Sequence, residues 1–195
     1  AQLMLQSPSP DLGEMKEIIA DIWRDNRRAS EVVRRLRSFV SKAPFQRQEF
    51  DLNDLVVESV KFLSAQAWSR EITLRIEPMR MPLRINGDPI QLQQVLSNVI
   101  LNAMDAVLDR PRAQRAVTVT TTLDRRFAEI CVEDTGPGVP AEAATKIFEP
   151  FFSTKDHGMG MGLSIARTIV TAHDGHIDVE NRNGAVFRIR LPLIE

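Results

Sequence analysis

The sequence of 195 residues contains a single cysteine, only three histidines and no long hydrophobic run. One cysteine, Cys131, excludes an internal disulfide, and its place in the apolar run 128–132 predicts a buried core residue in a reduced compartment. No stretch reaches the ~18–20 consecutive apolar residues that cross a bilayer, and no basic-then-apolar signal opens the chain. We therefore expect a cytoplasmic protein, anchored to a membrane only through segments that would precede these residues.

The chain also lacks a strong charge of either sign. Its 25 basic and 26 acidic residues give a net charge of -1, and 43% of the residues are hydrophobic. This composition is ordinary for a soluble globular protein and provides no general attraction to nucleic acid or to an anionic membrane. A charged ligand must therefore be held by local features.

Apolar residues recur every three or four positions over residues 15–40, which predicts one face of a long helix. Asp11, with Glu14 three residues later, forms a capping pattern before it, and Pro44 marks its end. Such a seam needs a second helix to cover it, so we expect one leg of a helical hairpin or dimeric bundle. The arginine-rich run 24–37 could bind nucleic acid, but its interleaved apolar and acidic residues favour a solvated helix face and no nucleic-acid partner.

The remainder of the chain alternates between helical and strand-like patterns. Asp88 and Pro89 form a cap and a first turn for the second of three predicted helices. Without a regular repeat, this alternation predicts an α+β fold, a two-layer α/β sandwich with one mostly antiparallel sheet covered by helices on one face. The predicted helices are 53–69, 89–108 and one ending near His173; the predicted strands are 72–76, 83–85, 117–123, 127–133, 176–180 and 186–191.

Two asparagines, Asn98 and Asn102, lie four residues apart on the same face of the helix predicted at 89–108. Asparagine is a mediocre helix former, so its presence twice on an otherwise apolar helix needs a reason. A side-chain amide oxygen is a hard, neutral ligand suited to Mg²⁺, whose other positions water and phosphate can fill. Hydrogen bonds from buried asparagines to neighbouring backbone would explain the pair equally well.

Two stretches contain glycines at alternate positions. In the stretch 134–139, Asp134 comes directly after a predicted strand and its carboxylate could accept a hydrogen bond from the amine of adenine, although an acidic strand end with a Pro-Gly turn is the simpler interpretation. The stretch 158–162 runs into a helix, where free backbone N–H groups favour phosphate. Because it does not follow a strand, it argues against a dinucleotide-binding fold.

Between these stretches, the phenylalanines of residues 148–152 could anchor a lid in the core, and Lys155 could reach a phosphate. A solvated lysine beside a small satellite core is the alternative. Further along the chain, Asn183 and Gly184 separate two predicted strands, where Asn-Gly is first of all a hairpin turn.

These patterns occur in a specific order: Asn-x-x-x-Asn, Asp-x-Gly-x-Gly, Phe-x-Pro-Phe, Gly-x-Gly-x-Gly-Leu and Asn-Gly-Ala. The order resembles the N, first glycine, F, second glycine and third glycine boxes of two-component sensor histidine kinases. The resemblance covers about residues 47–195. It implies the Bergerat-type ATP-binding fold of the GHKL superfamily, shared with Hsp90, gyrase B and MutL.

The resemblance implies that the chain binds ATP with Mg²⁺ and transfers the γ-phosphoryl group to a histidine. Asn102 would be the Mg²⁺ ligand and Asn98 its phosphate-side neighbour, while Lys155 would lie in a flexible lid over the phosphates. Asn98 and Lys155 would be the catalytic residues. Asp134 would contact the adenine amine. The implied nucleotide-binding residues are Asn98, Asn102, Asp105, Asp134, Gly136, Gly138, Val139, Phe148, Thr154, Lys155, Gly158, Gly160, Gly162 and Leu163.

Two other members of the superfamily provide alternatives. Hsp90-like ATPases carry a glutamate at the position of Asn98 that activates water, and an amide cannot act as that base, so Asn98 favours phosphoryl transfer over hydrolysis. An anti-sigma-factor serine kinase shares the fold, but the arginine-rich helix fits histidine kinases better. A nucleotide-sensing scaffold without catalysis and a pure dimerisation module remain as further alternatives.

By the same resemblance, residues 1–46 would be part of the dimerisation and phosphotransfer hairpin, and 47–195 the catalytic domain. The intact protein would be a homodimer that passes the phosphoryl group to the receiver domain of a response regulator. No histidine precedes His157, whereas the family's acceptor lies in the first hairpin helix. We therefore expect the chain to begin just after its acceptor and not to autophosphorylate by itself. At the end of a predicted helix, His173 and His176 would have capping or surface roles.

Overall fold

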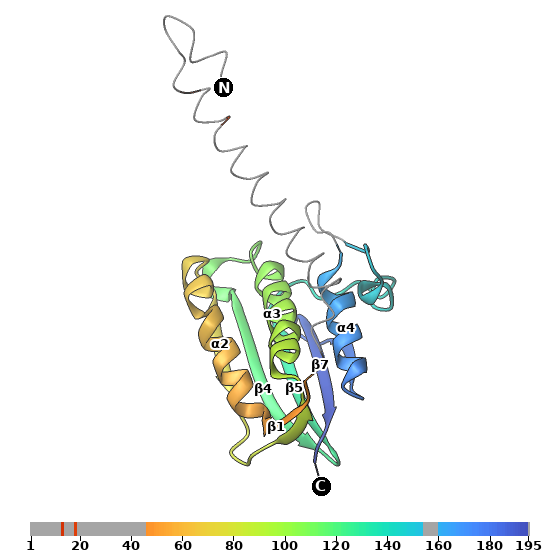
Figure 1. Cartoon of the computed structure of the whole chain (residues 1–195). Coiled ribbons are helices and arrows are strands. Elements are labelled where there is room, and N and C mark those ends of the chain that lie inside the picture. Colours follow the sequence, from red (N-terminus) through yellow and green to blue (C-terminus); the bar gives the residue numbers. More distant parts are fainter. Residues whose placement is uncertain (1–12, 14–17, 19–45, 154–159, 195) are drawn as a thin grey trace, which may run out of the picture. The chain divides into compact units, whose positions relative to one another are not determined.

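A computed structural model describes residues 13, 18, 46–153 and 160–194 of the chain (Figure 1). The chain divides into two compact units, residues 1–45 and 46–195. The long helix predicted at 15–40 lies outside the described residues except for Ile18. Ile18 and the earlier Gly13 are both helical. The architecture that follows is that of the second unit.

The second unit is built on a five-stranded sheet in the order β2-β4-β5-β7-β6. The edge strand β2 runs parallel to β4, and every other neighbouring pair is antiparallel. The predicted α+β fold with a mostly antiparallel sheet is therefore confirmed. The strands are β2 (Thr73–Glu77), β4 (Ala116–Asp124), β5 (Phe127–Asp134), β6 (His176–Asn181) and β7 (Ala185–Pro192).

Three helices cover one face of this sheet (Figure 1): α2 (Leu52–Ser69), α3 (Pro89–Ala106) and α4 (Gly162–Ala172). The predicted cap of α3 is present, since Asp88 Oδ1 accepts hydrogen bonds from the N–H groups of Ile90 and Gln91 at 3.0 and 3.1 Å. Two short 3₁₀ helices, η2 (Arg112–Gln114) and η3 (Lys146–Phe148), lie in the connections. Among the helices that the structure describes, none is long and apolar enough to cross a membrane.

A small second sheet joins β1 (Gln48–Asp51) to β3 (Arg84–Gly87) in antiparallel pairing. The strand predicted at 83–85 thus belongs to this sheet, and β1 was not predicted at all. Asp51 caps α2, and its Oδ1 accepts from the N–H groups of both Asn53 and Leu83 at 3.0 Å. One carboxylate therefore holds the start of α2 against the segment that enters β3.

The core lies between the three helices and the inner face of the sheet. Along β5, Ala128, Ile130 and Val132 are at most 2% exposed, whereas the residues between them point to the opposite face. Cys131 is one of these, so the prediction of a core cysteine is wrong: it is half-buried on the outer face, opposite Arg188, with Sγ 3.4 Å from Glu129 Oε1. Burial, with Glu129 nearby, raises the pKa of the Cys131 thiol to about 11.

Candidate functional site

Helix α3 carries both Asn98 and Asn102, and Asn98 connects it to α4. The side-chain amide of Asn98 donates a hydrogen bond to the carbonyl oxygen of Gly162, the first residue of α4, at 3.0 Å. Asn102 lies one turn further along the same face of α3 and is half-buried. The middle of α3 thus lies against the start of α4, and Asn98 has the backbone partner that a structural asparagine would have.

Asp134, the last residue of β5, is the charged group at the other end of the site. It is 1% exposed, and its Oδ1 accepts hydrogen bonds from the N–H groups of Gly136 at 2.8 Å and Ala185 at 3.2 Å. These bonds fix the carboxylate between the loop that follows β5 and the start of β7. A buried carboxylate held in this way presents a defined orientation to anything bound beside it.

The two glycines after Asp134 are required by close internal approach. A Cβ on Gly136 would lie 2.8 Å from the carbonyl oxygen of Ala106 at the end of α3. Gly138 has φ +79°, and a Cβ there would lie 2.8 Å from Oδ1 of Asn181. The first contact places the loop against α3, and the second places it against the end of β6.

A residue that the sequence analysis missed, Asn181, holds this loop. Its side-chain Oδ1 accepts from the N–H of Val139 at 2.9 Å, while its Nδ2 donates to the carbonyl oxygen of Val139 at 2.7 Å. Asn181 directly follows the strand predicted at 176–180, and local sequence gives no signal for its contact with Val139, 42 positions away.

The predicted hairpin is present, because β6 and β7 pair antiparallel through residues 182–184, with Asn181 opposite Ala185. Its turn is not the two-residue Asn-Gly type, which needs positive φ at its central residues, since neither Asn183 nor Gly184 has one. A Cβ on Gly184 would instead lie 2.0 Å from the carbonyl oxygen of Asp134. The residue must be glycine because two backbone segments touch there, and this contact was not visible from local turn chemistry.

The phenylalanine-rich stretch is divided between the core and the surface. Phe148 is buried, stacks edge-to-face on Phe187 with ring centroids 6.5 Å apart, and lies under the guanidinium of Arg167 at 5.8 Å. These contacts are those of a residue anchored in the core, and its role beside a nucleotide stays a prediction. Phe151, by contrast, is 78% exposed.

Gly160 packs on the end of this stretch. Its φ is +65°, its carbonyl oxygen accepts from the N–H of Phe151 at 3.1 Å, and a Cβ there would lie 2.3 Å from the carbonyl oxygen of Phe152. The backbone at Phe151 therefore lies directly beside the backbone at Gly160. The other predicted residues of this segment, Thr154, Lys155 and Gly158, lie outside the described residues.

Two further predicted residues lie at the margins of the site. Asp105, in the last turn of α3, forms an ion pair with Arg70 at 2.8 Å, beyond the end of α2. Leu163, in the first turn of α4, is half-buried and packs against the core. The structure thus brings Asn98, Gly162 and Leu163 together at one end of the site and Asp134, Gly136 and Ala106 at the other, with α3 between them.

Neither described histidine is placed as a phosphoryl acceptor. His173 is 2% exposed; its Nδ1 is 2.8 Å from the carbonyl oxygen of Ile169, and its Nε2 accepts from the N–H of Asp88 at 2.9 Å. It ends α4 as predicted, but its ring is buried rather than at the surface. Burial lowers its pKa, and the charge of Arg47 adds to the effect. His176 lies on the sheet edge, 3.8 Å from Asp178.

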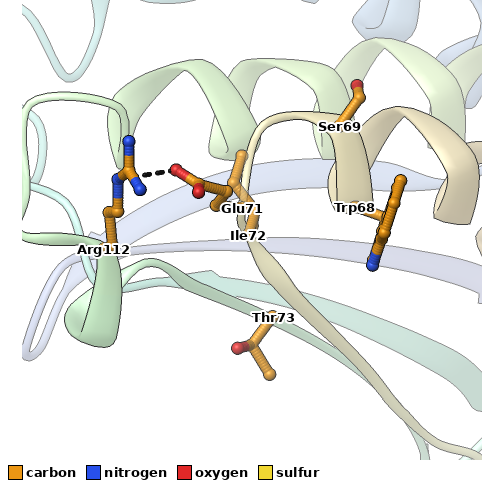
Figure 2. A pocket seen from close by; sticks show the side chains of 6 residues that line it. All are labelled: Trp68, Ser69, Glu71, Ile72, Thr73 and Arg112. Carbon is orange, nitrogen blue, oxygen red and sulfur yellow. Dashed lines mark ion pairs between the residues drawn. The ribbon is translucent and has the colours of Figure 1, made fainter.

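A surface hollow of about 780 Å³ lies away from these residues, between the end of α2 and the start of β2 (Figure 2). The ion pair of Glu71 and Arg112, 2.7 Å apart, forms one rim, and the 84% exposed indole of Trp68 forms another. None of the predicted nucleotide-binding residues lines it.

The described residues contain no group of three or more His, Cys, Asp or Glu side chains that could hold a metal ion by themselves. The oxygen donors of the Asn98 and Asn102 face are neutral amides. Such a donor set suits Mg²⁺ that obtains its remaining ligands from phosphate and water. The residues present therefore fit a cation that arrives with a nucleotide.

Comparison with known proteins gives a consistent assignment. Residues 87–195 match the family described as histidine kinase-, DNA gyrase B-, and HSP90-like ATPase. The chain is 33% identical over 188 residues to the sensor histidine kinase TmoS of Ectopseudomonas mendocina, covering 94% of this chain but only 19% of TmoS.

Solved structures agree with this match. The catalytic domain of histidine kinase ThkA superposes with a TM-score of 0.68 at 33% identity, covering 76% of this chain and 96% of that domain. ThkA in complex with the response regulator protein TrrA superposes with a TM-score of 0.79 at 28% identity, over 99% of this chain and 55% of ThkA.

Proposed function

Since this chain belongs to the histidine kinase-, DNA gyrase B- and HSP90-like ATPases and contains the catalytic, ATP-binding domain of a two-component sensor histidine kinase, we propose that it binds Mg-ATP along α3. The γ-phosphoryl group would pass to a histidine supplied by another segment. The observation that carries this proposal is the hydrogen bond from Asn98 to Gly162, which joins the asparagine helix to the glycine-led start of α4.

The adenine end of the site would be the end of β5. Asp134 Oδ1 accepts from Gly136 and Ala185, which fixes the orientation of the carboxylate, and we assign the adenine amine to this carboxylate. The backbone at Gly136 to Val139 would form the adjacent wall. Selectivity for adenine follows, because a carboxylate accepts from an exocyclic amine but repels the carbonyl oxygen found at that position in hypoxanthine.

The phosphate end would be the start of α4. Met161 precedes this 11-residue helix and provides no side-chain cap, so the first backbone N–H groups and the helix dipole can favour phosphate. Asn102, with Asn98 beside it, would hold Mg²⁺. Bound there, the cation would neutralise phosphate charge during transfer. Thr154, Lys155 and Gly158 would complete this end.

Transfer is favoured over hydrolysis by the chemistry of Asn98. A hydrolase needs a base to activate water, and the Asn98 amide donates to Gly162 and cannot accept a proton at neutral pH. The site would thus hold ATP until an acceptor imidazole is brought to it, and positioning would provide most of the catalysis.

The acceptor, the partner and the location are part of the same proposal. His173 is enclosed by Ile169 and Asp88, so it is unsuited to accept a phosphoryl group. We assign residues 1–46 to a dimerisation hairpin whose other helix supplies the acceptor, and 47–195 to the catalytic domain. The intact protein would be a cytoplasmic homodimer with a response regulator as its downstream partner, and the ThkA–TrrA complex supports that class of partner.

Calorimetric titration of the chain with ADP and Mg²⁺ tests nucleotide binding. Asp134→Asn is the sharpest variant, because its amide oxygen can still accept from Gly136 and Ala185 while its amino group cannot accept from adenine. We expect it to fold and to bind ADP at least about tenfold more weakly, the equivalent of one lost charge-assisted hydrogen bond. Asn102→Asp should also change Mg-ADP affinity. Unchanged affinity in both variants would refute the site.

Labelled ATP tests the transfer. The chain alone should remain unlabelled, and a separate hairpin helix carrying a histidine should become labelled in its presence. Stable, acid-labile labelling of the chain by itself would contradict the proposal that the acceptor lies elsewhere. Tight binding without labelling of any supplied helix would favour a nucleotide-sensing scaffold.

A further inference from the structure

The connection between β6 and β7 makes three separate contacts with the end of β5 and the loop that follows it. The Ala185 N–H donates to Asp134 Oδ1 at 3.2 Å, and Gly184 packs directly on the Asp134 backbone. The third contact is the pair of hydrogen bonds between the Asn181 amide and the Val139 peptide, at 2.9 and 2.7 Å.

The Asn181 contact differs from the other two because Asn181 contributes its side chain, whereas Gly184 and Ala185 contribute only backbone. A primary amide offers one acceptor and two donors, so a single Asn181 side chain can satisfy both the N–H and the C=O of Val139. Two bonds from one planar group fix orientation as well as distance, as in other two-point contacts. Gly138, with φ +79°, turns the backbone so that it lies directly against this amide.

From these contacts we infer that Asn181 is a positioning residue for adenine recognition, an inference that rests on the proposed function. It holds Gly138 and Val139 at the distance from Asp134 at which the carboxylate and the loop backbone form one adenine-selective wall. Asn181 does not contact the reacting atoms. It acts on nucleotide selectivity through the loop that it holds.

The two hydrogen bonds between Asn181 and Val139 determine which substitutions test the inference. Asn181→Ala removes both hydrogen bonds, whereas Asn181→Asp keeps an acceptor for the Val139 N–H and loses the donor to its carbonyl oxygen. Asn183→Ala is the matched control, because Asn183 is an exposed asparagine in the same connection. Each variant is also compared by thermal unfolding, because a general loss of stability could weaken nucleotide binding without any change at Val139.

The first measurement is the affinity of the chain for ADP and for IDP with Mg²⁺. IDP has the same phosphates but a carbonyl group where ADP has its amine, so the ratio of the two affinities reports on the adenine wall alone. We expect Asn181→Ala to bind ADP about tenfold more weakly while IDP changes little, with Asn183→Ala equal to the unaltered chain. Equal losses for the two nucleotides, or no loss, would overturn the inference.

The second measurement is hydrogen exchange of the Val139 amide in the chain without nucleotide. Its exchange should accelerate about tenfold in Asn181→Ala and by less in Asn181→Asp, while the amide of Val132 in the centre of β5 keeps its protection. Unchanged exchange at Val139 would refute the positioning role. If the unaltered chain binds neither nucleotide, the proposed function and this role in recognition both fall, and accelerated exchange then shows only a structural contact.

Discussion

The amide of Asn98 and the carbonyl oxygen of Gly162 are 3.0 Å apart, although the two residues are 64 positions apart in the sequence. Through this one bond, a residue in the middle of α3 fixes where α4 begins. Every phosphate contact that we propose on α3 and α4 lies within a turn of one of these two residues. The bond is thus the point at which stability and nucleotide binding are coupled.

Removing the Asn98 side chain by Asn98→Ala should therefore affect both properties. A half-buried hydrogen bond contributes about 1 kcal/mol, so we expect the free energy of unfolding to fall by about that amount, together with weaker binding of Mg-ADP. Urea unfolding and calorimetry measure the two effects. Ser97→Ala, one residue earlier on the same helix, is the control and should change neither. Unaltered ADP affinity in Asn98→Ala would show that this hydrogen bond does not contribute to nucleotide binding.

The buried ring of His173 predicts a stability that depends on pH. Its folded-state pKa is lowered from the ordinary value of 6.5, so the unfolded chain takes up a proton at a higher pH than the folded chain does. The stability contributed by neutral His173 is complete above about pH 7 and is lost as the pH falls below 6.5.

Urea unfolding between pH 5 and pH 8 measures this dependence. Protonation would remove the acceptor that Nε2 offers to the Asp88 N–H and place a charge near Arg47. His173→Gln should be less stable at pH 8 but should lose less further stability at pH 5 than the unaltered chain. His176→Gln, a change at the exposed histidine, should keep the original pH profile. A profile that His173→Gln leaves unchanged would contradict the assignment.

Two glycines of the candidate site should respond in opposite ways to alanine. In Gly184→Ala the new Cβ would lie 2.0 Å from the carbonyl oxygen of Asp134, so backbone must move and we expect a loss of about 2 kcal/mol or more. In Gly162→Ala the Cβ would be 3.8 Å from Asn98, an ordinary contact, and alanine is the better helix former. Its stability should be unchanged or higher by about 0.5–1 kcal/mol. Thermal unfolding compares them, and equal effects would contradict the geometry.

Local chemistry was sufficient to predict the helices and the hairpin. The Asp88 and Pro89 pair located the start of α3, and the alternation on either side of residues 124–126 located β4 and β5. The end of α3 was predicted at Leu108 rather than Ala106, because no glycine or proline marks the boundary. These features depend on neighbours in the sequence, which sequence reasoning can evaluate.

The errors concern contacts between distant segments. Strand β1 has only four residues, and its strand partner β3 is more than thirty residues away, so periodicity gave no signal for it. Cys131 was placed on the wrong face because its apolar neighbours were counted as a run rather than as alternating positions. Gly184 was assigned only to a turn and Asn181 had no predicted role, since only the folded chain brings them to Asp134 and Val139.

The pairing of β5 with β7 has a consequence for how the chain can vary. Between Asp134 and Ala185 the chain must close into a loop before these strands can meet, and that loop holds most of the glycines of the candidate site. Closure entropy grows only with the logarithm of length, about 0.6 kcal/mol for each doubling. Insertions at exposed positions such as Ala141 and Glu142, away from the buried anchor Phe148, should therefore be inexpensive for folding. Homologous chains can thus change the length of this segment while β5, α3 and α4 keep the fixed groups in place.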